Sequence, residues 1–102
     1  MSPTRRALKL SRKESLILDL LVDGDEMYGL QLVAASRRRL KRGTVYVTLG
    51  RMEDKGYVAS RLENAPAEAG GLPRRKYRAT ALGRRVLEAL AHVAALVPEF
   101  GR

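Results

Sequence analysis

The chain has 102 residues, no cysteine and one histidine, which excludes disulfides, thiolate metal sites and clusters of imidazole ligands. Its 20 lysine and arginine residues outnumber the 11 acidic residues and give a formal charge of +9. The length predicts one small domain with a modest core. The basic excess favours a nucleic acid as partner, although membranes and acidic proteins also attract such charge.

Residues 1–10 are predicted to form a basic N-terminal arm. No long apolar run follows, so neither a signal peptide nor a membrane-spanning helix is expected, and a cytoplasmic location fits. Ser11 and Glu14 have the spacing of a capping box, which predicts a helix over residues 12–22. Apolar residues surround more than half of this helix. We therefore expect burial against both the core and a partner, with Leu16 and Leu20 at the partner.

A second helix is predicted over residues 26–36, after turn chemistry at residues 23–25. Tyr28 in this helix, and Tyr77 further along the chain, are expected to place their rings in the core. Arg37 and Arg38 follow the helix and have two equally favoured interpretations. They either contact DNA phosphates or stabilise the negative end of the helix dipole.

The third predicted helix starts near residue 41, after the expected buried anchor Leu40, and ends at residue 55, before a glycine suited to a left-handed cap. Its residues Val45, Leu49 and Met52 recur at i, i+4 and i+7, which predicts one face packed on the core.

The opposite face of this third helix needs a functional explanation. Each glycine there costs about 0.8–1.0 kcal/mol relative to alanine, and an exposed tyrosine and valine add nothing to folding. Small residues let a helix approach a phosphate closely, and tyrosine can stack or donate a hydrogen bond. We therefore interpret it as a DNA recognition helix, although the tyrosine could instead pack beside a wing. The candidate contacts are Lys41, Arg42, Gly43, Thr44, Tyr46, Val47, Gly50 and Arg51.

Residues 57–62 and 75–79 have strand composition, and a segment rich in proline and glycine connects them over residues 63–73. A helix-turn-helix followed by such a hairpin is a winged helix. Arg74, Arg75 and Lys76 flank the expected wing tip, so we expect them to contact phosphates or the minor groove.

The last helix is predicted over residues 80–97, with Thr80 as its cap and a proline behind its end. Its apolar stripe is broader than packing on a small domain requires, which indicates self-association. The expected dimer interface consists of Leu16, Leu20, Leu87, Leu90, Val93, Ala94 and Val97.

Four segments together resemble the PadR family of bacterial winged-helix repressors: Tyr28-Gly29, Gly43-Thr44-Val45-Tyr46, Leu49 to Gly56 and Gly71 to Gly83. The resemblance implies a homodimer in which the C-terminal helix packs across the two-fold axis, often against the first helix of the partner. Lys41 stands where the family often has a capping residue, and Val47 where it often has proline. The short C-terminal part indicates a minimal form.

The sequence therefore predicts a mostly α fold with a small β-hairpin. Its expected parts are an arm over 1–10, a winged helix-turn-helix over 11–79, and a dimerisation helix with its tail over 80–102. We expect a sequence-specific regulator, a repressor that binds a palindromic operator in double-stranded DNA as a homodimer. The alternative is a protein-interaction adapter. No enzyme, metal, cofactor or membrane partner is expected, because no catalytic or ligand constellation is present; an effector stays open.

Overall fold

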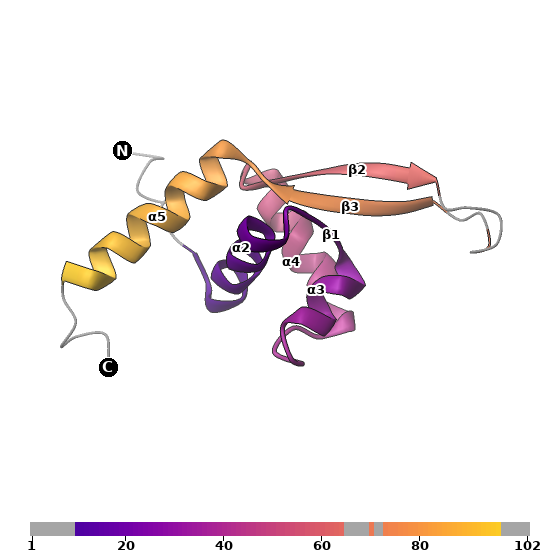
Figure 1. The fold of residues 1–102 in the computed structure, drawn as a ribbon, viewed down its shortest axis with the longest axis horizontal. Coiled ribbons are helices and arrows are strands. Elements are labelled where there is room, and N and C mark those ends of the chain that lie inside the picture. The colour runs from indigo at the N-terminus through magenta and orange to yellow at the C-terminus, as the bar shows by residue number, and fades with distance from the viewer. Residues whose placement is uncertain (1–9, 65–69, 71–72, 97–102) are drawn as a thin grey trace.

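The computed structural model describes residues 10–64, 70 and 73–96, and for residues 93–96 it describes the backbone alone (Figure 1). Most of the predicted arm, much of the wing connection, and Val97 lie outside the described residues. The elements in chain order are α2 (Arg12–Gly24), β1 (Glu26–Tyr28), α3 (Gly29–Ala35), α4 (Arg42–Asp54), β2 (Val58–Asn64), β3 (Pro73–Ala79) and α5 (Ala81–Leu96).

The capping box at the start of α2 is confirmed. The Glu14 amide donates to Ser11 Oγ at 3.1 Å, and the Ser11 amide donates to Glu14 Oε1 at 2.9 Å. Both bonds satisfy backbone donors that the first turn of a helix leaves free. The helix then buries Ile17, Leu18 and Leu21 in the core.

The core is built by one face from each of several elements. The predicted stripe of α4 is confirmed, because Val45, Leu49 and Met52 are fully buried. Residues from α3, from the turns before α4 and before β2, from the sheet and from α5 complete this cluster, namely Leu32, Leu40, Tyr57, Val58, Tyr77, Ala79 and Val86. The burial of Leu40 and Tyr77 confirms two further predictions.

The start of the predicted second helix is wrong. Residues Glu26–Tyr28 form strand β1, and the helix α3 covers only Gly29–Ala35. The reason is tertiary, because β1 pairs antiparallel with β3, Met27 opposite Tyr77. The predicted hairpin of β2 and β3 therefore gains a third strand, in the order β1-β3-β2. Tyr28 is accordingly half-buried on the sheet, not in the core.

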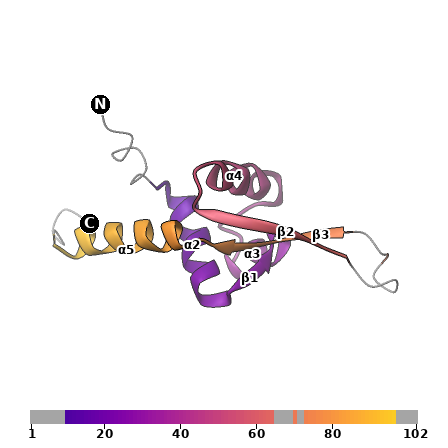
Figure 2. The same cartoon turned by 90° about the horizontal axis from the view of Figure 1, so that it is seen from above.

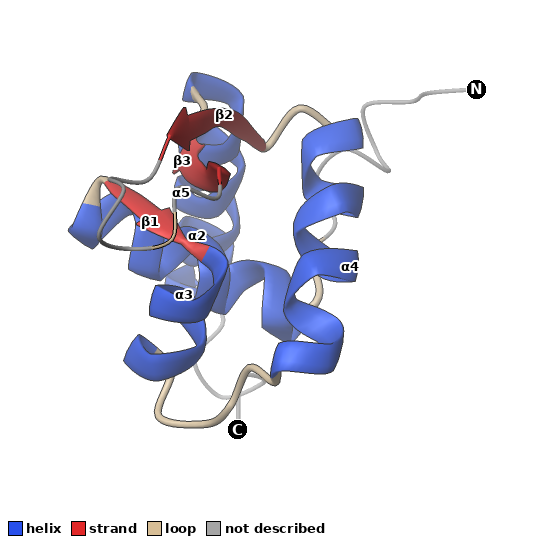
Figure 3. Ribbon diagram, turned by 90° about the vertical axis from the view of Figure 1, so that its right-hand side faces the viewer, coloured by secondary structure: helices blue, strands red, loops and turns tan. Residues whose placement is uncertain are grey.

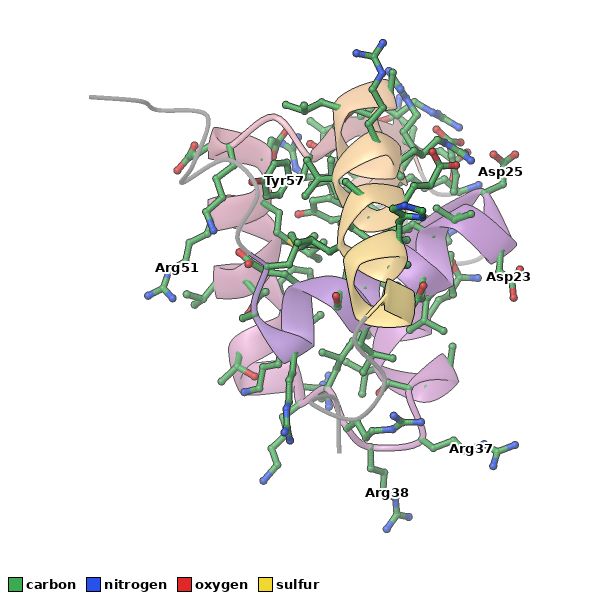
Figure 4. The ribbon with its side chains drawn as sticks, turned by 90° about the vertical axis from the view of Figure 1, so that its left-hand side faces the viewer. Asp23, Asp25, Arg37, Arg38, Arg51 and Tyr57 are labelled. Carbon is green, nitrogen blue, oxygen red and sulfur yellow. The ribbon has the colours of Figure 1, made fainter. Side chains whose placement is uncertain are left out.

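The helix-turn-helix consists of α3 and α4, joined at the bottom of Figure 3 by a turn. Ser36 fixes this turn from inside, because its hydroxyl donates to the Val33 carbonyl at 2.7 Å and accepts the Leu40 amide at 2.9 Å. Arg37 and Arg38 have positive φ angles of 55° and 72°, and their side chains project outward (Figure 4). At the other end of α4, Gly56 has the expected left-handed conformation with φ of 81°.

Helix α5 and the β2–β3 hairpin extend from the helical body in opposite directions (Figure 1, Figure 2). Thr80 caps α5 as predicted, because its Oγ1 accepts the Gly83 amide at 3.0 Å. None of the helices over the described residues is long and apolar enough to cross a membrane.

Candidate nucleic-acid interface

The outer face of α4 is exposed and uneven. Tyr46 is 48% exposed and Val47 is 56% exposed, although both are large hydrophobic residues. A Cβ added at Gly43 or Gly50 would meet no atom within 4 Å. Neither glycine is therefore required by packing inside the chain, and both leave the helix backbone open to an outside partner.

A cleft of about 470 Å³ separates this face from the wing, and we call it the wing cleft. Its walls are Tyr28, Leu30 and Gln31 on one side, Tyr46 on α4, and Pro73 to Arg75 on β3. Tyr46 lies directly over the backbone of Gly29, because a Cβ added at Gly29 would clash with its ring. Tyr46 thus packs partly within the chain, against the start of α3, and still exposes half of its surface.

Two cations of β3, Arg74 and Lys76, lie over the ring of Tyr28. Its hydroxyl donates a hydrogen bond to the Glu63 carboxylate on β2. This bond raises the pKa of Tyr28 above its usual value and lowers the pKa of Glu63. The Arg74 guanidinium stands 4.3 Å and the Lys76 ammonium 5.2 Å from the centre of the Tyr28 ring. Arg74 is therefore held at the mouth of the wing cleft.

The neighbouring Arg75 is fixed by a different set of partners. Its Nη1 donates to Ser60 Oγ at 3.0 Å, and that hydroxyl donates to Glu53 Oε2 of α4 at 2.7 Å. The wing is thereby tied to α4 by side chains from three elements, β3, β2 and α4. Lys76 is partly neutralised, since its Nζ lies 3.8 Å from Glu63 Oε2.

A second network at the wing base was not predicted. Arg61 on β2 donates two hydrogen bonds to Glu26 on β1, at 3.0 and 2.8 Å. Hydrogen bonds from Arg61 lower the pKa of Glu26 below its usual value. These residues are 35 positions apart, and only the β1–β3–β2 order brings them together.

The remaining predicted contacts lie on α4 or on the turn that precedes it. Arg51 points away from the body along the outer side of α4, while Arg37 and Arg38 project from the turn (Figure 4). Lys41, Arg42 and Thr44 are exposed at the start of α4. Lys41 supplies no side-chain cap there, and its carbonyl accepts the amides of Thr44 and Val45.

Four of the predicted dimer residues can be placed, two on α2 and two on α5. Leu16, Leu20, Leu87 and Leu90 are half-buried and pack against the edge of the core. The side chains of Val93 and Ala94, and all of Val97, lie outside the described residues. Within the part of the chain that the structure describes, no group of three or more acidic, histidine or cysteine side chains is placed to hold a metal ion.

Comparisons with known structures agree with this geometry. A PadR family transcription regulator from Clostridium difficile is 29% identical, with a TM-score of 0.74, over 88% of this chain and 94% of that one. A PadR family regulator from Eggerthella lenta is 32% identical, with a TM-score of 0.69, over 86% and 77% of the two chains. A putative transcriptional regulator from Thermoplasma acidophilum, at 22% identity and a TM-score of 0.72 over 86% and 84%, shares the fold.

No curated protein matches the chain significantly in sequence. The sequence model described as the transcriptional regulator PadR-like family matches residues 17–89, which include the helix-turn-helix, the sheet and the first half of α5. The winged-helix fold and this match lead to one conclusion: the chain belongs to the PadR-like family of transcriptional regulators.

Proposed function

We propose that the protein is a repressor that binds a palindromic operator as a homodimer, with α4 in the major groove and the wing against the adjacent backbone. The observation that carries this proposal is the outer face of α4. It leaves half of Tyr46 and of Val47 exposed, and it leaves the backbone open at Gly43 and Gly50, although glycine costs helix stability. A major groove about 12 Å wide admits such a helix.

The roles of individual residues follow from their positions. Val47 is the most exposed apolar side chain of α4 and is suited to contact a thymine methyl group. Arg51 and Arg42 are the guanidinium groups of the helix and can bind guanine or phosphate. Arg74 and Arg75, held by Tyr28 and Ser60, are suited to phosphates beside the groove.

The homodimer is supported by the half-buried leucines of α2 and α5. Helix α5 extends away from the body (Figure 2). Its Leu87 and Leu90 are only half-buried against the edge of the core, so a second copy could cover the surface that they leave exposed. Two-fold symmetry would then present two copies of α4 to two half-sites.

Selection of duplexes from a randomised pool tests the operator. We expect an enriched palindrome, and its affinity should fall by about 10³–10⁵ between 50 and 200 mM salt if six to ten phosphates are neutralised. Tyr46→Ala should reduce discrimination between the selected and random duplexes, while Arg74→Ala should weaken both similarly. Selection without enrichment, or binding that ignores salt, would contradict the proposal.

Analytical ultracentrifugation tests the dimer. Leu87→Asp/Leu90→Asp places two charges without evident partners in the proposed interface, and we expect a monomer with weak operator binding. Ala89→Asp on the exposed side of α5 is the control and should remain dimeric. A folded Leu87→Asp/Leu90→Asp dimer with unchanged operator affinity would place the interface elsewhere.

A further inference from the structure

A second cleft lies on the flank of α4 that faces the start of α2. It has a volume of about 650 Å³, and we call it the basic cleft. Arg12 and Lys13 of α2 form one wall, and Thr44, Val47 and Arg51 of α4 form the other. Val47 is also the exposed apolar residue at the outer face of α4, so the basic cleft opens on the side proposed to meet DNA.

The charge of the basic cleft is positive after its internal ion pair is accounted for. Glu14 is buried, its Oε2 accepts a hydrogen bond from Lys55 Nζ at 2.8 Å, and its Oε1 accepts the Ser11 amide at 2.9 Å. Glu14 and Lys55 therefore neutralise each other. Over the described residues, Arg12, Lys13 and Arg51 have no carboxylate within ion-pair distance.

The positions of Arg12 and Lys13 are unfavourable for folding. They are the first two residues of α2, where the helix dipole is positive and where carboxylates, not cations, are stabilising. Two exposed cations there repel the dipole and each other. Their presence beside a third unpaired cation on α4 is explained if the basic cleft receives an anion.

Duplex DNA bound to α4 would supply that anion in the required place. A helix that lies in the major groove has a phosphate backbone on each side, and the wing cleft and the basic cleft flank α4 on its two sides. In the proposed complex, Arg74 and Arg75 at the wing cleft would face one backbone. The opposite backbone would then run along the start of α2.

We propose that the basic cleft is a second phosphate clamp, in which Arg12 and Lys13 bind the backbone of the strand opposite the wing. This inference rests on the proposed binding of DNA by α4 and adds to it a contact from the first helix. The clamp would hold α4 in the groove from both sides, and it carries no base preference, because phosphate contacts position a protein without reading sequence.

The slope of operator affinity against salt tests the clamp. If each of the two cations neutralises one phosphate in each of the two half-sites, the clamp accounts for four phosphates. Each phosphate contributes about 0.9 to the slope of log K against log salt, so Arg12→Ala/Lys13→Ala should make that slope shallower by about 3.6. The preference for the operator over random DNA should not change. Arg84→Ala/Arg85→Ala on α5 removes the same charge outside both clefts and should keep the wild-type slope.

Two further measurements separate the possible failures. The thermal midpoint of Arg12→Ala/Lys13→Ala should not fall, since the variant removes cations from a positive helix end, and the swap Arg12→Lys/Lys13→Arg should retain the slope. An unchanged slope in a folded double alanine variant, or an equal loss in the α5 control, would overturn the clamp while leaving α4 and the wing as the DNA surface. Wild-type protein that binds no duplex would overturn the proposed function and the clamp together.

Discussion

Gly50→Ala is expected to stabilise the free protein and to weaken its complex with DNA. Gly50 lies in the middle of α4, on the exposed side, and a Cβ added there meets no atom within 4 Å. The substitution therefore gains helix propensity without a steric penalty, about 0.8–1.0 kcal/mol. In a domain of this size, such a gain raises the thermal midpoint by about 4–8 °C.

The same methyl group would obstruct DNA if the groove wall approaches the backbone of α4 at Gly50. Loss of one close contact costs about 1–3 kcal/mol, which corresponds to a loss of affinity of about 5- to 150-fold. Thermal unfolding at a fixed protein concentration measures the first effect, and fluorescence anisotropy with the selected operator measures the second.

Ser15→Ala on α2 is the control, because it also introduces a better helix former but lies outside both clefts. It should raise stability by a few tenths of a kcal/mol and leave affinity unchanged. Gly50→Ala with higher stability and wild-type affinity would refute the reasoning, because the glycine would then have no function in DNA binding.

Three further substitutions test the packing that positions α4. Burial alone would raise the pKa of Glu14, but hydrogen bonds from Lys55 and Ser11 outweigh it and hold that pKa below its usual value. Glu14→Gln should therefore lower the free energy of unfolding in urea by about 1–2 kcal/mol at pH 7. The difference in stability between wild type and variant should shrink as pH falls through the folded pKa of Glu14. A difference that stays constant with pH would contradict this prediction. Ser36→Ala leaves the buried Leu40 amide without its acceptor and should lower the free energy of unfolding in urea by about 1–3 kcal/mol. An unchanged urea midpoint would show that the turn does not depend on this hydrogen bond. Gly83→Ala places a Cβ against the Tyr57 carbonyl oxygen, well inside van der Waals contact. The overpacking should lower the free energy of unfolding by about 1–3 kcal/mol, which is more than the gain in helix propensity. A thermal midpoint above that of the wild type would disprove this prediction.

Local chemistry was sufficient to predict much of the fold. The Ser11–Glu14 capping box, the Thr80 cap and the left-handed Gly56 are each decided by residues within about one helical turn of the boundary they set. The two faces of α4 follow from helical periodicity, which predicted the buried stripe and the exposed face that bears Tyr46. These features depend on short-range geometry, so the order of the residues encodes them directly.

The sheet and the arrangement of its cations depend on pairing between distant segments. Residues 26–28 are too few for an alternating pattern to indicate a strand, and they form β1 because they pair with β3. That pairing moves Tyr28 from the predicted core to the wing base, where it contacts Arg74 and Glu63. Likewise, Glu14 and Lys55 are 41 positions apart, and the basic cleft between their helices exists only after α2 and α4 pack. The sequence by itself determined the capped starts of α2 and α5 and the two faces of α4, because those are local. Only the tertiary structure decided which cations flank α4 on each side, because that depends on contacts whose two partners lie far apart along the chain.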